Sequence, residues 1–485
     1  MWLSWLETAP MLFPTVDYGL FFLLVFAASW GLRHWLRAHH GFLLAASYSF
    51  YAFCDWRSLP LLVGLSVFAA LVARSLQRLT RPKLRRGLVW VGVSVALGTL
   101  AGLKYLGLLV AFALGALQAF GVTPPPVRLP EIGLPVGISF FVFHAISLMV
   151  DAYRRRIAVP VRLLDALLYM AFFPQLVAGP ILRASTFLSQ LSIAPDPRRI
   201  EASRAMGLIV WGLVKKVLIA SFLATHVVDP VFESPTLHGG LGALLAIYGY
   251  AGQIFCDFSG YTDIAVGSAL LLGYRFPENF WAPGLAESPQ DFWRRWHLSL
   301  STWLRDYLFI SLGGSRRGSA RTLLNLAVTM VLGGLWHGAA LTFVLWGALH
   351  GAGLIAHRLW AASSLGPIQR LRAWRPWRII SVVATFHFVC LGWVLFRSTS
   401  ASAALELLEA LAQPWVTGPW LSPAVLIAVS AGVLSQLVPP GRLGRVQAFF
   451  ERIPLPAQGV LVALAILGLE ALAPRGIAPF IYFRF

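Results

Sequence analysis

The stretch from Leu323 to Trp360 constrains the fold most strongly, because it is 38 residues long and almost free of charge. As one helix it would be about 57 Å long at about 1.5 Å per residue, whereas the hydrocarbon core of a membrane is about 30 Å thick. One straight span is therefore excluded. Three glycines surround His337, at Gly333, Gly334 and Gly338. The sequence predicts a break there, with irregular backbone that is buried in protein or lines a cavity.

The rest of the chain is also strongly apolar. Hydrophobic residues make up 58% of the 485 positions and charged residues only 12%, against about 25% charged residues in soluble domains. Apolar runs long enough to span a membrane, or nearly so, lie at 12–35, 41–54, 58–73, 87–120, 132–150, 163–182, 205–228, 239–273, 323–360, 379–396, 422–438 and 457–473. We therefore predict an all-α polytopic membrane protein with about 11–14 transmembrane helices, as one domain over residues 1–485.

The chain carries 39 Lys and Arg against 20 Asp and Glu, a net charge of +19. In a soluble protein this excess would suggest a nucleic-acid partner. Here the basic residues cluster between apolar runs, as they do in cytoplasmic loops of membrane proteins, so we expect a lipid membrane and no nucleic acid. These loops are Arg74–Arg86, Arg154–Arg162, Arg198–Arg204, Arg316 with Arg317 and Arg321, and Arg370–Arg378.

The cysteines and the N-terminus indicate no further chemistry. Cys54, Cys256 and Cys390 lie in apolar surroundings without paired or metal-ligand spacing, so we expect packing residues, no disulfide framework and no metal site. The N-terminal segment lacks the basic region of a secretory signal, and its first apolar run is expected to be a retained span.

Histidines in apolar runs are the first candidates for a site. An ionisable side chain at membrane depth costs a few kcal/mol and marks a functional site by default, which makes His337 a candidate; the alternative is a helix-packing histidine. His350 lies nearer the end of its run, where an interfacial or packing role is expected. His144 lacks close glycines, so packing is expected there and a cavity-lining role stays open.

His297 lies in a basic, tryptophan-rich segment. Apolar residues recur at spacings of three or four, which predicts one face of a helix at the membrane interface. His297 is then either a polar residue on that interface or a second member of a site with His337. The apolar positions are Trp293, Trp296, Leu300, Trp303 and Tyr307.

A second interrupted segment lies upstream. Phe172–Ile181 contains Pro174, Gly179 and Pro180. Proline lacks a backbone donor, so a broken or re-entrant segment is expected rather than a straight helix.

Several ordered blocks resemble the membrane-bound O-acyltransferase family and, within it, the alginate O-acetyltransferase branch. The resemblance covers Leu134 to the C-terminus and is densest from Cys256 to Gly351. The blocks are Leu134–Ser147, Phe172–Ile181, Cys256–Gly267, Phe276–Phe280, Asp291–Arg316, Leu332–Gly351, Trp393–Ser398 and the terminal FIYFRF. Cys256, where an aromatic residue is common, and Ser315, where Asn is expected, depart from the pattern.

The resemblance implies a fold, a pair of catalytic residues and a reaction. Re-entrant segments surround a central cavity; His337 is the catalytic histidine, and His297 is the second motif histidine. It implies an O-acetyltransferase, multi-pass in the bacterial inner membrane, with acetyl-CoA as donor and no tightly bound cofactor. The acceptor is an extracytoplasmic polysaccharide or a periplasmic acetyltransferase partner.

Acyl transfer to a hydroxyl needs a base for the hydroxyl proton and a group that stabilises the oxyanion. A neutral imidazole suits the first task, and we assign it to His337. His297 can orient the acceptor, donate to the oxyanion or position the thioester. Four arginines either attract the phosphates of CoA or serve topology alone: Arg294, Arg295, Arg316 and Arg317.

Other polar and aromatic residues are weaker candidates. Asp257, Ser259, Tyr261 and Asp263 interrupt the apolar run from residue 239 and either line the cavity or, for the two aspartates, cap helices or pair with loop arginines. Family blocks add a further set with structural, donor-side or cavity-lining roles: Trp296, Trp336, Asn279, Arg305 and Asp306.

Alternatives remain within the family and outside it. Peptidoglycan and cellulose acetylation are close competitors, and D-alanyl transfer to teichoic acid shares the two histidines. A polytopic transporter or flippase would also use broken helices and polar residues at membrane depth. The sequence has no second copy of the His337 block, which disfavours a transporter with repeated halves.

Overall fold

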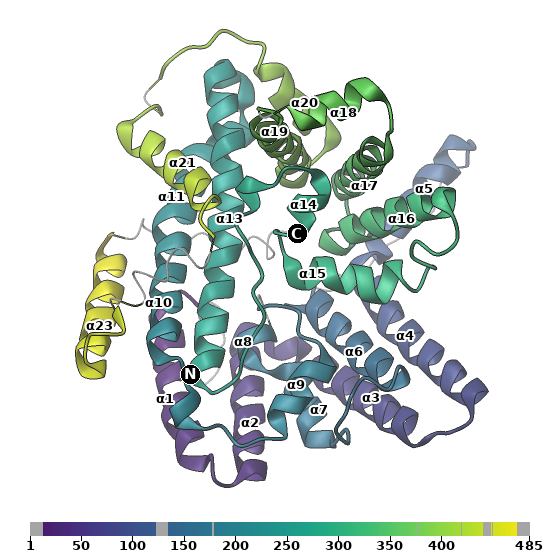
Figure 1. The fold of residues 1–485 in the computed structure, drawn as a ribbon, viewed down its shortest axis with the longest axis vertical. Coiled ribbons are helices and arrows are strands. Elements are labelled where there is room, and N and C mark those ends of the chain that lie inside the picture. Colours follow the sequence, from purple (N-terminus) through teal and green to yellow (C-terminus); the bar gives the residue numbers. More distant parts are fainter. Residues whose placement is uncertain are drawn as a thin grey trace. The chain divides into compact units, whose positions relative to one another are not determined.

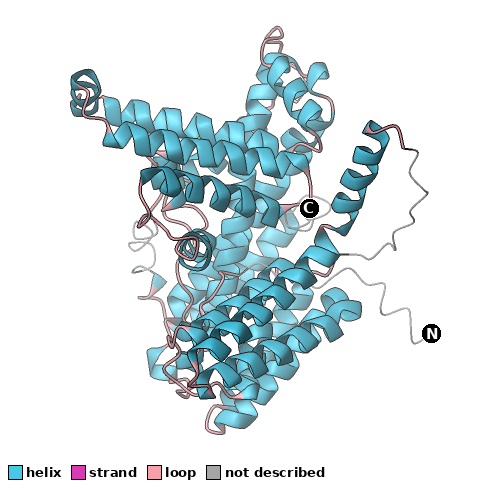
Figure 2. Cartoon of the chain, turned by 90° about the vertical axis from the view of Figure 1, so that its right-hand side faces the viewer, coloured by secondary structure: helices cyan, strands magenta, loops and turns pink. Residues whose placement is uncertain are grey.

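The computed structural model describes residues 13–122, 134–176, 179–374, 376–418, 420–439, 448 and 450–472. Within these ranges every regular element is a helix, as Figures 1 and 2 show. The predicted all-α fold is therefore confirmed. The terminal FIYFRF lies outside the described residues.

Long apolar helices dominate the part of the chain that the structure describes. Five helical stretches there have the length and composition to cross a membrane: Leu36–Arg78, Pro82–Lys104, Ala202–Glu233, Gly239–Leu271 and Trp377–Arg397. Shorter apolar helices accompany them. The expected total of about 11–14 spans stays a prediction.

The chain divides into two compact units. One comprises Met1–Glu201 and Ser268–Phe276, and the other comprises Ala202–Gly267 and Pro277–Phe485. Each is described by itself below. The expectation of a single domain stays a prediction.

The first unit contains nine α-helices in its described part. Two of its buried histidines have polar partners: Ser29 Oγ lies 2.7 Å from His39 Nε2, and His40 Nδ1 lies 2.8 Å from Asp165. His144 is fully buried with its ring edge against Tyr169, which fits the expected packing role. The helices are α1 (Val16–Leu32), α2 (Leu36–Asp55), α3 (Leu59–Arg78), α4 (Pro82–Lys104), α5 (Leu106–Ala119), α6 (Ile138–Tyr153), α7 (Leu163–Ala171), α8 (Phe173–Leu176) and α9 (Ala184–Leu191).

The segment around Pro174 is broken, as predicted. Helix α7 ends at Ala171, α8 is a single turn, and the next helix begins only at Ala184. The Phe173 N–H at this break donates to Ser47 Oγ at 3.2 Å, so a side chain takes the donor that a continuous helix would have used internally.

The second unit begins with a helical stretch that packs along α13. This stretch is α10 (Ala202–Leu213), a π-helical segment (Val214–Ala220), α11 (Ser221–Leu223), a second π-helical segment (Ala224–Val228) and α12 (Asp229–Glu233). Helix α13 (Gly239–Leu271) is continuous for 33 residues. The apolar run 239–273 therefore forms one helix.

Helix α13 stays unbroken because its glycines and polar residues fit the neighbouring stretch. A Cβ on Gly260 would lie 2.7 Å from the Gly212 carbonyl oxygen, and one on Gly212 would lie 2.6 Å from the Gly260 carbonyl oxygen. Only glycine lets the two backbones approach so closely. Three polar side chains of α13, those of Asp257, Ser259 and Asp263, find their partners on the same neighbour.

Several of the remaining helices of the second unit enclose the candidate site. Helices α16 and α17 form a hairpin and lie side by side in Figure 1. The helices are α14 (Pro289–Trp293), α15 (Leu298–Trp303), a π-helical segment (Leu304–Phe309), α16 (Ser319–His337), α17 (Leu341–Ala362), α18 (Gly366–Ala373), α19 (Trp377–Arg397), α20 (Ala401–Ala410), α21 (Pro423–Ser435) and α23 (Leu455–Leu472).

The predicted break near His337 is confirmed. Helix α16 ends at His337, and Gly338 continues in extended backbone before α17 begins at Leu341. The Phe343 ring covers Gly338 so closely that a Cβ would collide with it. The close pairing of α16 with α17 also needs Gly347, where a Cβ would lie 2.5 Å from the Met330 carbonyl oxygen.

Candidate active site

One small cavity in the second unit brings His297 and His337 together. Its volume is about 10 Å³, close to what one water molecule requires. Both histidines are buried, with 1% and 6% of their surface exposed. Its walls come from α13, the α14–α15 segment, the α16–α17 hairpin and α19: Ile254, Phe258, Trp293, Trp296, His297, Leu300, His337, Trp346, Trp393 and Phe396.

His337 reaches the cavity because α16 ends there. Aromatic rings surround its imidazole, with ring centroids 4.8 Å away at Trp336, 5.0 Å at Trp346 and 5.0 Å at Phe396. As the last residue of its helix, the side chain lies beside the extended backbone that starts at Gly338. A histidine in an apolar wall fits a role as a neutral base better than a role as a fixed charge.

His297 lies at a sharp turn between two short helices. Its backbone is left-handed, with φ 45° and ψ 55°, and it directly precedes α15. The expected single helical face from Trp293 to Tyr307 is therefore wrong. The turn buries Trp293, Trp296 and His297, so His297 lies inside the protein and not exposed at an interface.

A polar network holds the His297 ring. Asn279 Oδ1 lies 3.2 Å from His297 Nδ1 and accepts from both the N–H and the hydroxyl of Ser299, at 3.1 and 2.9 Å. The Leu298 N–H donates to the Asn279 carbonyl oxygen at 2.9 Å. Phe258 packs edge-to-face on the ring with centroids 4.6 Å apart. Asn279 thus holds the Nδ1 edge of the imidazole, and Phe258 restricts rotation of the ring.

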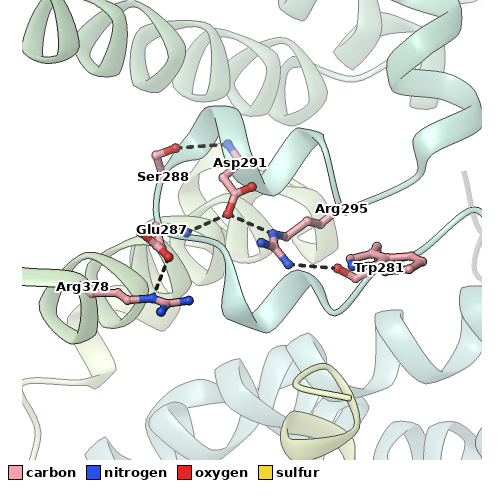
Figure 3. Close-up of polar contacts among 6 residues, drawn as sticks. All are labelled: Trp281, Glu287, Ser288, Asp291, Arg295 and Arg378. Carbon is pink, nitrogen blue, oxygen red and sulfur yellow. Dashed lines mark hydrogen bonds and ion pairs between the residues drawn. The ribbon is translucent and has the colours of Figure 1, made fainter. Parts of the chain in front are cut away.

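The segment before His297 is fastened by polar contacts that Figure 3 shows. Ser288 caps α14 by accepting from the Asp291 N–H, and Asp291 also accepts from Glu287 N–H and from Arg295. Arg378 of α19 pairs with Glu287 at 2.8 Å. These contacts anchor the turn that carries His297.

His350, the third histidine of the apolar run Leu323–Trp360 and the His297 segment before it, serves packing. His350 is fully buried, with ring centroids 4.7 Å from Trp346 and 5.3 Å from Trp293. It is not among the residues that line the cavity. The expected packing role is confirmed.

The aspartates of α13 pair with lysines instead of meeting loop arginines. Lys216 Nζ lies 2.7 Å from Asp257, and Lys215 Nζ lies 2.6 Å from Asp263 and 2.8 Å from Ser259. Both lysines belong to the π-helical segment Val214–Ala220. Tyr261 lies in the same cluster, with its ring centroid 5.4 Å from Lys216 Nζ. The expected pairing with loop arginines is therefore wrong, and a role of Asp257 or Tyr261 at the substrate cavity stays a prediction.

The other predicted site residues separate into two groups. Trp296 lines the cavity, Asn279 holds His297, and the Trp336 ring lies 6.3 Å from the His297 ring. Arg305 and Asp306 instead pair with each other at 2.7 Å, and the Arg305 side chain is 61% exposed. The described cavity wall does not include them.

The four candidate donor-side arginines also differ from one another. Arg295 is half-buried and held by Asp291 at 2.9 Å. Arg294, Arg316 and Arg317 are exposed. Exposed arginines suit either a phosphate-bearing donor or the topology role.

Sequence reasoning missed most of the cavity wall. Trp393 and Phe396 lie within the family block Trp393–Ser398, so a signal for them existed. Phe258 likewise lies within the block Cys256–Gly267, whereas Ile254 lies outside every block and carries no such signal.

Comparison with known proteins identifies the family. The model of the family "MBOAT, membrane-bound O-acyltransferase family" matches residues 138–402. This chain belongs to the membrane-bound O-acyltransferase family. It is therefore a multi-pass membrane enzyme that transfers an acyl group to a hydroxyl, and both motif histidines lie inside the matched region.

Three relatives illustrate the range of this acyltransferase family. The "Probable alginate O-acetylase AlgI" of Pseudomonas putida is 37% identical over 83% of this chain and 80% of its own length. The "Peptidoglycan O-acetyltransferase" of Helicobacter pylori is 34% identical over 76% and 73%. The "Teichoic acid D-alanyltransferase" of Bacillus subtilis is 30% identical over 54% and 68%. Acyl transfer unites the three names, whereas the acceptors differ.

Proposed function

We propose that this acyltransferase moves an acetyl group from acetyl-CoA at the cytoplasmic face of the inner membrane to a hydroxyl acceptor on the other side, for O-acetylation of an extracytoplasmic polysaccharide of the alginate type. The observation that carries the proposal is the small cavity where His297 and His337 meet. The name of the Pseudomonas putida relative supports acetyl transfer to alginate.

The proposed reaction uses His337 as the base. The acceptor hydroxyl oxygen attacks the thioester carbonyl carbon while His337 takes the hydroxyl proton. The tetrahedral oxyanion then collapses, the carbon–sulfur bond breaks, and the proton passes from His337 to the thiolate. The products are the acetyl ester and free CoA thiol. The aromatic walls keep water away from the reacting carbonyl.

The acceptor is the least constrained part of the proposal. Peptidoglycan acetylation is the second candidate, because the Helicobacter pylori relative is 34% identical over most of both chains. D-Alanyl transfer ranks lower, since the Bacillus subtilis relative covers only 54% of this chain. A periplasmic acetyltransferase can also receive the acetyl group first and pass it to the polymer.

The test is acetyl transfer by the purified full chain in liposomes. Radiolabelled acetyl-CoA is supplied outside and oligomannuronate is enclosed inside, so that only protein with its donor face outward reacts. His337→Ala is the test variant. His350→Phe is the matched control, because it replaces a buried histidine of the same unit that packs among aromatic rings.

Label on the enclosed oligomannuronate with wild type and His350→Phe, but not with His337→Ala, is the expected result. Label that appears only when peptidoglycan fragments replace oligomannuronate would reassign the acceptor. Full transfer by His337→Ala would remove His337 from the mechanism. No transfer with either acceptor, together with movement of an unmodified oligosaccharide across the membrane, would favour the transporter alternative.

A further inference from the structure

The contacts of Asn279 determine which nitrogen of His297 carries the proton. The Ser299 backbone N–H can only donate, and it points at Asn279 Oδ1 from 3.1 Å. A reversed amide would set two donors against each other, so the atom there is the oxygen. Asn279 Nδ2 then faces Thr262 Oγ1 at 3.4 Å, where a hydroxyl accepts.

The same oxygen lies 3.2 Å from His297 Nδ1. If Nδ1 carried a lone pair, two acceptors would face each other inside the protein. The Ser299 hydroxyl does not relieve this conflict, because it lies 2.9 Å from the Asn279 oxygen but 3.4 Å from Nδ1. The imidazole therefore carries its proton on Nδ1 and donates it to Asn279.

The other ring nitrogen, Nε2, is available to a substrate. Nε2 of His297 is buried and has no hydrogen-bond partner among the described residues, and His297 lines the cavity. No charged side chain is among the described cavity-lining residues, and burial among aromatic rings disfavours the protonated imidazolium. A neutral ring with its proton on Nδ1 presents a lone pair at Nε2.

We propose that Asn279 is a positioning residue that holds His297 in this tautomer, so that His297 meets the substrates as a hydrogen-bond acceptor. Of the three roles open for His297, donation to the oxyanion requires an N–H at Nε2 and is excluded. Positioning the thioester carbonyl requires a donor as well. Orientation of the acceptor remains, and it fits a lone pair.

The inference rests on the proposed function for the identity of the oriented group. Because His337 takes the reacting proton there, Nε2 of His297 receives a second O–H. A carbohydrate acceptor supplies one from the hydroxyl adjacent to the reacting hydroxyl. The substrate class that this geometry favours is therefore a sugar with neighbouring free hydroxyls.

The first measurement needs neither donor nor acceptor. Solid-state NMR of the full chain in liposomes, with ¹⁵N,¹³C-labelled histidine, reports the tautomer of each ring. The His297 signals are assigned by their loss in His297→Gln. We expect protonated Nδ1 and bare Nε2 in wild type, in Asn279→Asp and in Thr262→Val, whereas Asn279→Leu shifts the tautomer. An Nε2–H signal in wild type would overturn the proposal.

The second measurement follows release of CoA thiol from acetyl-CoA with oligomannuronate as acceptor. We expect Asn279→Leu to lower kcat about 10–100-fold, as loss of a histidine-orienting partner does elsewhere. The KM for oligomannuronate rises and the KM for acetyl-CoA stays within about twofold, because the donor does not contact Nε2. Asn279→Asp keeps the acceptor oxygen and recovers most of kcat.

Thr262→Val separates positioning from packing. It keeps the shape of Thr262 and removes the contact of Asn279 that does not involve His297. Near-wild-type kcat in this variant supports the proposal. A loss equal to that of Asn279→Leu, or no recovery in Asn279→Asp, would show that Asn279 acts through packing. If wild type has the expected tautomer but transfers no acetyl group, the proposed function fails while the tautomer assignment stands.

Discussion

Adjacent residues of α13 belong to two different buried polar regions of the second unit. Asp257 pairs with Lys216, whereas the next residue, Phe258, packs on His297 and lines the cavity. In the lysine–aspartate cluster each charge meets an opposite charge within 2.7 Å. In the cavity the Nε2 atom of His297 meets no partner among the described residues.

The difference teaches how to separate structural from functional polar groups inside a membrane protein. A buried charge that is paired holds two helices together, and removing one partner leaves the other uncompensated. A buried nitrogen that faces a cavity gains its partner only when a substrate enters. Changes in the cluster should therefore alter stability, and changes in the cavity should alter activity.

The largest expected effect is on activity, from His337→Ala. Loss of a general base lowers the rate of acetyl transfer by about 10²–10⁴-fold. The variant should keep the thermal stability of wild type in detergent, because the truncated ring belongs to a cavity wall. Rates come from CoA release and stability from thermal melting. A variant with a lower melting temperature and an unchanged rate would show that His337 supports stability and not catalysis.

The next effect is on stability, from Lys216→Met. Removing the ammonium group beside buried Asp257 costs about 3–5 kcal/mol of unfolding free energy. The double variant Lys216→Met with Asp257→Asn should recover much of this loss, since no charge is then left buried. Denaturant melts in mixed micelles measure both. If the single variant is as stable as wild type, the Lys216–Asp257 pair does not contribute to the free energy of unfolding.

A smaller effect is expected from Gly260→Ala at the crossing of α13 with α10. The added Cβ would lie 2.7 Å from the Gly212 carbonyl oxygen, so one helix must shift. Overpacking of this kind costs about 1–3 kcal/mol. Gly459→Ala is the matched control, because nothing lies within 4 Å of its added Cβ. The two variants should differ in melting temperature, and identical values would contradict the close approach.

The smallest effect is expected from Glu287→Gln. The ion pair with Arg378 is exposed, with 44% of the Glu287 side chain and 78% of the Arg378 side chain accessible. Exposed pairs contribute about 0–1 kcal/mol, and salt screens them. Melting at low and high salt measures this term. A loss of acetyl transfer with unchanged stability would instead connect this pair to the orientation of the His297 turn.

The accuracy of the sequence predictions depended on the residues involved. The break at His337 was predictable because three glycines interrupt a run too long for one span. The broken segment at Pro174 was predictable because proline removes a backbone donor. The left-handed turn at His297 was not predictable from spacing, because the same tryptophans at intervals of three or four also describe one helix face.

The partners of the polar residues also could not be predicted from residue spacing in the sequence. Asp257 and Asn279 lie 22 residues apart, yet one meets a lysine at position 216 and the other meets His297. Each pairing depends on how closely two segments of the fold approach each other, and that distance follows from side chains on both segments. A single sequence records each side chain but not the distance between them.

The sequence by itself determined that this protein is an all-α membrane acyltransferase, because apolar length, glycine breaks and ordered motifs are local properties of the chain. Only the tertiary structure decided that His297 and His337 share one cavity, that Asn279 holds one of them, and that the aspartates of α13 belong to a separate cluster. These are relations between residues far apart in the chain, which exist only after packing brings their helices together.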